Sequence, residues 1–62
     1  MIIKTKQVGV FHKQVIEGKF IFEDEDKIRL NEVTVENVGS NFKFMLDVLD
    51  IEKNKIEKVV DR

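Results

Sequence analysis

The sequence predicts a small all-β domain, and three observations support this prediction. First, the apolar residues are mostly β-branched, with nine Val and seven Ile against three Leu and no Ala. Branching at Cβ restricts the χ1 angle, which disfavours helices and suits the pleated surface of a sheet. Second, apolar and polar residues alternate in several segments, as in half-buried strands. Third, short polar segments separate these runs without any proline, which favours strands joined by hairpins.

The first two strands are expected over residues 2–11 and 15–22. The first segment alternates between apolar and polar residues, and the polar pair His12 and Lys13 can reverse the chain after it. The second segment contains Gly18, and a glycine inside a strand often marks a bulge or a bend. These two segments should therefore form a first hairpin.

The third and fourth strands are expected over residues 28–35 and 42–51. In the third strand the alternation shifts by one position at Asn31 and Glu32, as a β-bulge would cause. Between the two strands, Gly39 is followed by two small polar residues, a composition typical of a tight turn. We expect a second hairpin with this turn at its tip.

A fifth strand is expected over residues 56–60, after a turn formed by the sequence EKNK. Five strands joined by short hairpins predict a meander closed into a barrel-like domain, about the size of an SH3 or OB domain. The C-terminal segment has a helical alternative, because residues 41–61 written as a helix place several apolar residues on one stripe. These residues are Phe42, Met45, Leu46, Leu49, Ile56 and Val60, with Ser40 available as the N-cap.

A chain of 62 residues provides one domain, residues 1–62, near the lower size limit for independent folding. Without cysteine it has no disulfides or thiolate zinc sites, and the lone histidine cannot build a metal site, so no cofactor is expected. Adjacent apolar pairs such as Ile2-Ile3 and Val59-Val60 place apolar side chains on both faces of a strand. We therefore expect a homo-oligomer, a dimer or larger, which would also stabilise so small a fold.

Four consecutive acids interrupt the stretch FIFEDEDKIRL, and they are the first candidate site. Calcium-binding loops need alternating carboxylates and a glycine at the sharp turn, but Arg29 occupies the glycine position, so no metal site is expected. The run fits the solvated tip of a hairpin, where it could also contact a basic partner protein. The residues of this candidate partner-binding turn are Glu23, Asp24, Glu25 and Asp26.

Basic and aromatic residues gather in the N-terminal third of the chain and form the second candidate site. Residues 1–22 carry four lysines and one glutamate, whereas residues 23–37 carry six acids and two bases. Small β-barrels bind single-stranded nucleic acids by stacking bases on exposed aromatics within a basic groove. The residues of this candidate nucleic-acid surface are Lys4, Lys6, Phe11, Lys13, Lys19 and Phe20. The alternative is that the phenylalanines are core residues and the lysines lie along half-exposed strands.

An enzyme is not expected, because so short a chain has little room for a pocket as well as a core, and its three glycines form no phosphate-binding loop. The leading hypothesis is a small interaction or regulatory protein that acts through protein–protein contacts, of the kind that phages and mobile elements encode. Nucleic-acid binding and a structural or assembly role are the alternatives. No segment has the pattern of a signal peptide or a membrane span, so we expect a cytoplasmic protein.

Overall fold

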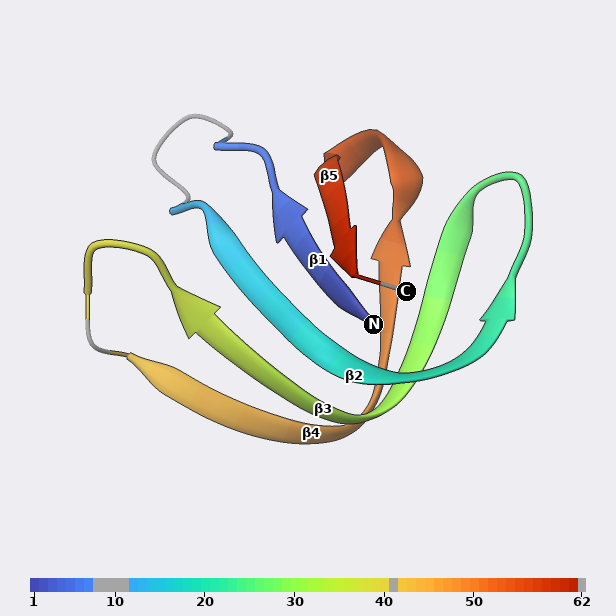
Figure 1. Cartoon of the computed structure of the whole chain (residues 1–62), viewed down its shortest axis with the longest axis horizontal. Helices are drawn as coiled ribbons and strands as arrows, with labels where there is room; N and C mark the ends of the chain where they lie inside the picture. The colour runs from blue at the N-terminus through green and yellow to red at the C-terminus, as the bar shows by residue number, and fades with distance from the viewer. Residues whose placement is uncertain (8–11, 41, 62) are drawn as a thin grey trace.

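Five antiparallel strands make up the fold in the computed structural model, which describes residues 1–7, 12–40 and 42–61 (Figure 1). The described residues contain no α-helix. The all-β prediction is confirmed. The strands are β1 (Ile2–Thr5), β2 (Gln14–Glu23), β3 (Lys27–Asn37), β4 (Lys43–Glu52) and β5 (Ile56–Asp61), and a short 3-10 turn, η1 (Lys53–Lys55), joins the last two.

The strand order is β4-β3-β2-β1-β5, so β1 to β4 form a meander, but the predicted barrel-like closure is wrong and β5 does not continue the meander. The chain does not pair β5 with β4. Instead, η1 carries it across one end of the sheet, where the amide of Lys6 donates to the carbonyl of Lys55 at 2.8 Å, and β5 pairs with β1. A closed barrel needs mutually consistent strand lengths and stagger, but β1 has only four residues and pairs only with the first half of β2. The result is a strongly curved, open sheet (Figure 1).

The helical alternative for the C-terminal segment is also wrong, because residues 43–52 and 56–61 are strands. β4 pairs with β3 without a register shift, from Lys43 opposite Glu36 to Glu52 opposite Lys27. This register buries Ile51, which a helix would have placed outside its apolar stripe. Pairing with a neighbouring strand thus decides between two patterns that the local sequence left open.

The first strand is shorter than predicted. β1 ends at Thr5, whose buried hydroxyl accepts a hydrogen bond from the amide of Gln14 at 2.9 Å. Lys6 and Gln7 lie outside the strand, and residues 8–11 of the predicted strand lie outside the described residues. The Thr5 hydroxyl therefore links the end of β1 to the start of β2.

The core draws its buried apolar side chains from four of the five strands, β1 to β4. Partly buried side chains of Met1 and Phe44 are among those that pack against it. Aliphatic side chains of this kind provide most of the stabilisation of a small domain. The buried apolar residues are Ile3, Ile16, Ile28, Leu30, Val33, Val35 and Ile51.

Two irregularities bend the sheet in its middle. The β2–β3 register shifts between Glu17 and Lys19, around Gly18, and Glu32 on the facing strand has a positive φ of 50°. The predicted bulge at Asn31 and Glu32 is therefore confirmed. A second shift, between residues 20 and 22, leaves Ile21 without a partner in the β2–β3 pairing. Bulges increase the twist of a strand pair, which accounts for the strong curvature of β2 and β3.

Candidate interaction surface

The acidic run forms the β2–β3 turn, as predicted, and Asp24 builds it. Its Oδ1 accepts hydrogen bonds from the amides of Asp26 at 2.8 Å and Lys27 at 2.9 Å, while its own amide donates to the carbonyl of Lys27 at 3.0 Å. These two amide donors favour the carboxylate form and lower the pKa of Asp24. Asp24 therefore stabilises the turn by the side-chain-to-backbone bonding typical of Asx turns.

The rest of the acidic run divides into an anchored residue and two exposed ones. The carboxylate of Glu23 lies 2.8 Å from the ammonium of Lys53, and the amide of Lys53 donates to the carbonyl of Asp26 at 2.7 Å. These contacts tie the turn to η1. Glu25 and Asp26 are exposed, so their carboxylates remain accessible to a partner. In the described part of the chain, no three His, Asp or Glu side chains gather in a way that could hold a metal ion.

Three consecutive apolar residues lead into this turn, and all of them are exposed. Phe20, Ile21 and Phe22 have exposed fractions of 51 %, 47 % and 43 %. The β1–β2 pairing ends at Glu17, so the second half of β2 pairs with β3 on one side and has no described strand on its other side. The guanidinium of Arg29 lies 5.9 Å from the centre of the Phe22 ring. An apolar segment and two accessible carboxylates thus adjoin each other at one end of the sheet.

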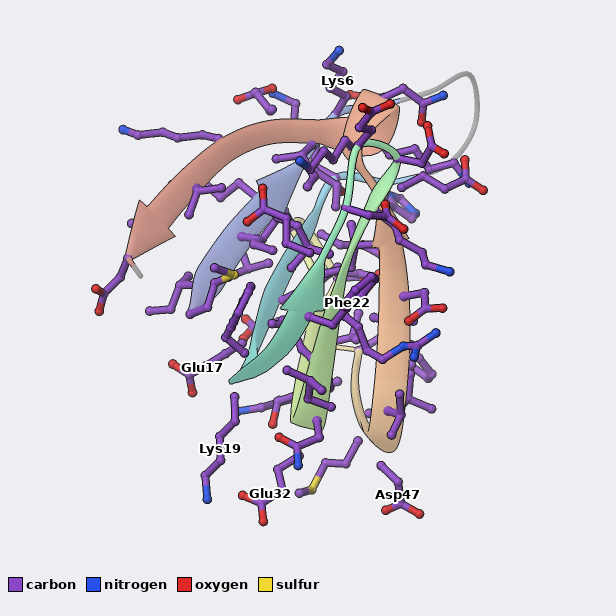
Figure 2. All side chains as sticks on the ribbon, turned by 90° about the vertical axis from the view of Figure 1, so that its right-hand side faces the viewer. Lys6, Glu17, Lys19, Phe22, Glu32 and Asp47 are labelled. Carbon is purple, nitrogen blue, oxygen red and sulfur yellow. The ribbon has the colours of Figure 1, made fainter. Side chains whose placement is uncertain are left out.

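The predicted basic and aromatic residues do not form one groove. Lys6 lies at one end of the molecule and Lys19 at the other (Figure 2). Lys13 pairs with Glu57 at 3.3 Å. Lys4 is exposed on β1, Phe20 belongs to the apolar segment described above, and Phe11 lies outside the described residues.

Lys19 is also partly neutralised by its neighbour. Its ammonium lies 2.8 Å from the Glu32 carboxylate, and this hydrogen bond raises the pKa of Lys19. A lysine paired in this way attracts phosphate less strongly than an unpaired one, because the carboxylate offsets its charge.

A second exposed apolar surface lies on β4, outside both candidate sites that the sequence suggested. Of the nine large apolar side chains exposed in the described part of the chain, four lie on or beside the first half of β4. Met45 is the most exposed of them, at 78 %. The adjacent pair Met45-Leu46 was a signal that both faces are apolar, but only the strand order shows that β4 is an edge strand. The four residues are Phe42, Met45, Leu46 and Val48.

A cleft of about 650 Å³ lies on the inner side of the sheet, between β4 and the ends of β1 and β2. Gln14 and Asn37, which line it, are hydrogen-bonded to each other at 3.0 Å. His12, the only histidine of the chain, lies at its rim with Lys55 and Glu52. No described serine or threonine hydroxyl lines the cleft except that of Thr5, which is bonded to the backbone of Gln14. These groups do not form a nucleophile–base pair.

No family model matches this chain, and no curated protein or solved structure matches it either. None of the helices in the described residues has the length and apolar character needed to cross a membrane. The arguments for function therefore rest on the surfaces of the molecule.

Proposed function

We propose that this protein is a small, non-enzymatic interaction protein that binds other proteins, including copies of itself. The observation that carries the proposal is the exposure of Phe20, Ile21 and Phe22 directly beside the acidic turn. Exposed apolar side chains that adjoin each other are a liability in a protein without a partner, and they mark contact sites when polar residues border them. The surface formed by residues 20–22 with Glu25 and Asp26 is called the β2 surface below.

The chemistry of the β2 surface indicates what its partner presents. Apolar residues would cover the two phenylalanines, and lysine or arginine would pair with the accessible carboxylates of Glu25 and Asp26. Such complementarity steers the encounter and selects the partner more than it adds affinity. The expected partner is therefore an apolar segment flanked by basic residues, on a protein of the cytoplasm.

Nucleic-acid binding has weaker support than protein binding. Lys13 and Lys19 are paired with glutamates, and Lys6 and Lys19 lie at opposite ends of the molecule (Figure 2). A groove for a single strand needs a continuous row of cations beside exposed aromatics. In this protein the exposed phenylalanines of β2 lie beside carboxylates, which repel phosphate.

The proposal can be tested by selecting short peptides from a random library on the immobilised protein. Selected peptides should combine apolar residues with Lys or Arg, and they should lose binding to the Phe20→Ser/Phe22→Ser variant. The Glu25→Lys/Asp26→Lys variant should weaken binding mainly at low ionic strength, because salt screens exposed charges. Val60→Ser on β5 is the matched control, because Val60 has a similar exposed fraction of 45 % but lies on another strand.

An amide NMR titration with a mixed-sequence single-stranded oligonucleotide completes the test. The proposal predicts a silent spectrum at both low and moderate salt. Salt-sensitive shifts at Lys4, Lys6 and Lys13 would contradict it and favour nucleic-acid binding. Peptides that bind the Phe20→Ser/Phe22→Ser variant as well as the native chain would contradict the assignment of the β2 surface.

A further inference from the structure

The outer edge of β4 is a free strand edge in the described part of the chain. There, β4 has a strand neighbour on one side only, β3, and the pairing with β3 runs without a register shift. The other accessible edge on this part of the sheet, along the second half of β2, is interrupted by the bulge at Ile21. Bulges protect edges against pairing with other chains, whereas a regular apolar edge invites it.

The side chains of this edge are apolar and exposed on both faces of the strand. Met45 points away from the core, while Phe44 and Leu46 lie on the core side, opposite Val35 and Val33. Leu46 keeps an exposed fraction of 36 % in spite of this position. A strand added beside β4 would therefore cover apolar surface on the core side as well as the outer side.

The charged side chains of β4 indicate which charges a strand paired with its free edge should carry. Asp50 is held by Arg29, and Glu52 lies 3.7 Å from the ammonium of Lys55. Lys43 and Asp47 have no ion pair with any described residue. These two opposite charges are four residues apart, with Met45 midway between them. The charges are therefore self-complementary under a two-fold rotation about Met45.

We propose that a second copy of this chain pairs with the β4 edge, antiparallel and centred on Met45. In this register the two Met45 residues face each other, Lys43 of each copy lies opposite Asp47 of the other, and Phe44 lies opposite Leu46. The two sheets join into one, with an isologous interface. This inference rests on the self-association included in the proposed function and adds its surface and register.

The backbone of Met45 is oriented as this register requires. The amide of Asn37 donates to the carbonyl of Phe42 at 3.0 Å, and by antiparallel alternation Phe44 and Leu46 are the next residues that bond to β3. Met45 lies between two of these residues, Phe44 and Leu46, and its own amide and carbonyl therefore point to the free edge. Two such residues that face each other can exchange both of their backbone hydrogen bonds.

A neighbouring register is less favourable. A shift by two positions, the smallest that antiparallel pairing of β4 with itself allows, would place Lys43 opposite Leu49 and Met45 opposite Asp47. Both charged side chains would then lie opposite apolar residues. The register centred on Met45 instead pairs the two unpaired charges.

A single introduced cysteine tests both the edge and the register, because the chain has no cysteine of its own. Directly opposite residues of an antiparallel pair that exchange both backbone hydrogen bonds have Cα atoms about 5.5 Å apart, within the range that a disulfide can bridge. The Met45→Cys variant should form a disulfide-linked dimer under mild oxidation. Val48→Cys is the matched control, because Val48 is exposed on the same strand but would lie far from its counterpart in the other copy. Circular dichroism confirms that both variants are folded.

Charge substitutions provide the second measurement, by sedimentation equilibrium of the full chain. Lys43→Asp and Asp47→Lys should each weaken the dimer roughly tenfold, since each replaces two symmetric attractions by repulsions. The double variant, Lys43→Asp/Asp47→Lys, should return to near the native dissociation constant. A restored dimer in the double variant cannot result from general damage to the fold.

Three results would overturn the inference. These are a native chain that stays monomeric at millimolar concentration, cross-linking of the Val48→Cys variant as fast as that of Met45→Cys, and a double charge variant no stronger than the single ones. None of these affects peptide binding at the β2 surface, which is measured on Phe20 and Phe22. Conversely, suppose that the library yields no peptide whose binding depends on Phe20 and Phe22 while the Met45→Cys variant still cross-links. That result would overturn the proposed role of the β2 surface and leave the β4 dimer in place.

Discussion

Arg29 and Asp50 face each other across β3 and β4, and the guanidinium holds the carboxylate with two hydrogen bonds. Nε donates to Oδ1 at 2.7 Å and Nη2 donates to Oδ2 at 3.0 Å. The same guanidinium lies over the Phe22 ring on β2. Arg29 therefore connects three strands beside the β2 surface, and its planar fork suits both contacts.

Replacing Arg29 by lysine should lower the melting temperature slightly although the charge is kept. Lysine cannot form the two-bond pair with Asp50, and it stacks less well on Phe22. The loss should shrink at about 1 M salt, where exposed ion pairs are screened. Thermal denaturation followed by circular dichroism measures both effects, with Lys58→Arg on β5 as the control. An Arg29→Lys variant as stable as the native chain at low salt would show that the pair does not stabilise the sheet.

The positive φ of Glu32 predicts an unusual gain of stability. In this conformation the Cβ of any residue except glycine lies too close to the following carbonyl oxygen, at a cost of about 1–2 kcal/mol, but Asn tolerates it better because its short polar side chain can hydrogen-bond locally. Glu32→Asn should therefore raise the free energy of unfolding by roughly 0.5 kcal/mol. The same substitution at Glu36, an exposed residue of the same strand, should lower it because Asn disfavours regular strands. Urea unfolding measures the free energy of unfolding of both variants. A change of the same sign at the two positions would contradict the strain argument.

Gly18 should not tolerate even one added methyl group. A Cβ at this position would lie 3.0 Å from the backbone oxygen of Asn31 and 3.1 Å from Cβ of Leu30. Neither atom can move without shifting β3, so Gly18→Ala should cost about 1–3 kcal/mol of unfolding free energy. Lys19→Ala, at the next and exposed position, is the control and should change stability little. Full stability of the Gly18→Ala variant would mean that the two strands can separate at the bend.

Acid should weaken the fold through Asp24 and Asp50. Hydrogen bonds from the amides of Asp26 and Lys27 lower the pKa of Asp24, and the Arg29 guanidinium lowers the pKa of Asp50, both from a usual value of 3.8. Because the folded-state pKa values lie below the unfolded ones, this stabilisation is present above pH 3.8 and is lost as the pH falls through the folded-state values.

Urea unfolding between about pH 6 and about pH 2 would measure this loss. The Asp24→Asn/Asp50→Asn variant should be less stable than the native chain at neutral pH and should lose less stability on acidification. If the free energy of unfolding falls by the same amount on acidification in both proteins, the acid sensitivity does not come from these two carboxylates.

Much of the local structure followed from the sequence. The β-branched residues predicted a sheet, the shift in alternation at Asn31 and Glu32 predicted a bulge, and the acidic run predicted a turn. Each of these features depends on interactions within a few residues, such as the Asx bonding of Asp24 or the packing of alternate side chains on one face.

The tertiary structure decided the features that depend on distant pairing. Whether β5 lies beside β4 or β1 depends on how η1 crosses the end of the sheet, and whether residues 43–52 form a strand depends on the edge that β3 offers. The candidate surfaces followed from these choices. Phe20 and Phe22 are exposed because β1 is too short to cover them, and Met45 is exposed because β4 became an edge strand. Alternation in the sequence shows which side chains share a face of a strand, but only the strand order shows which faces and edges remain uncovered.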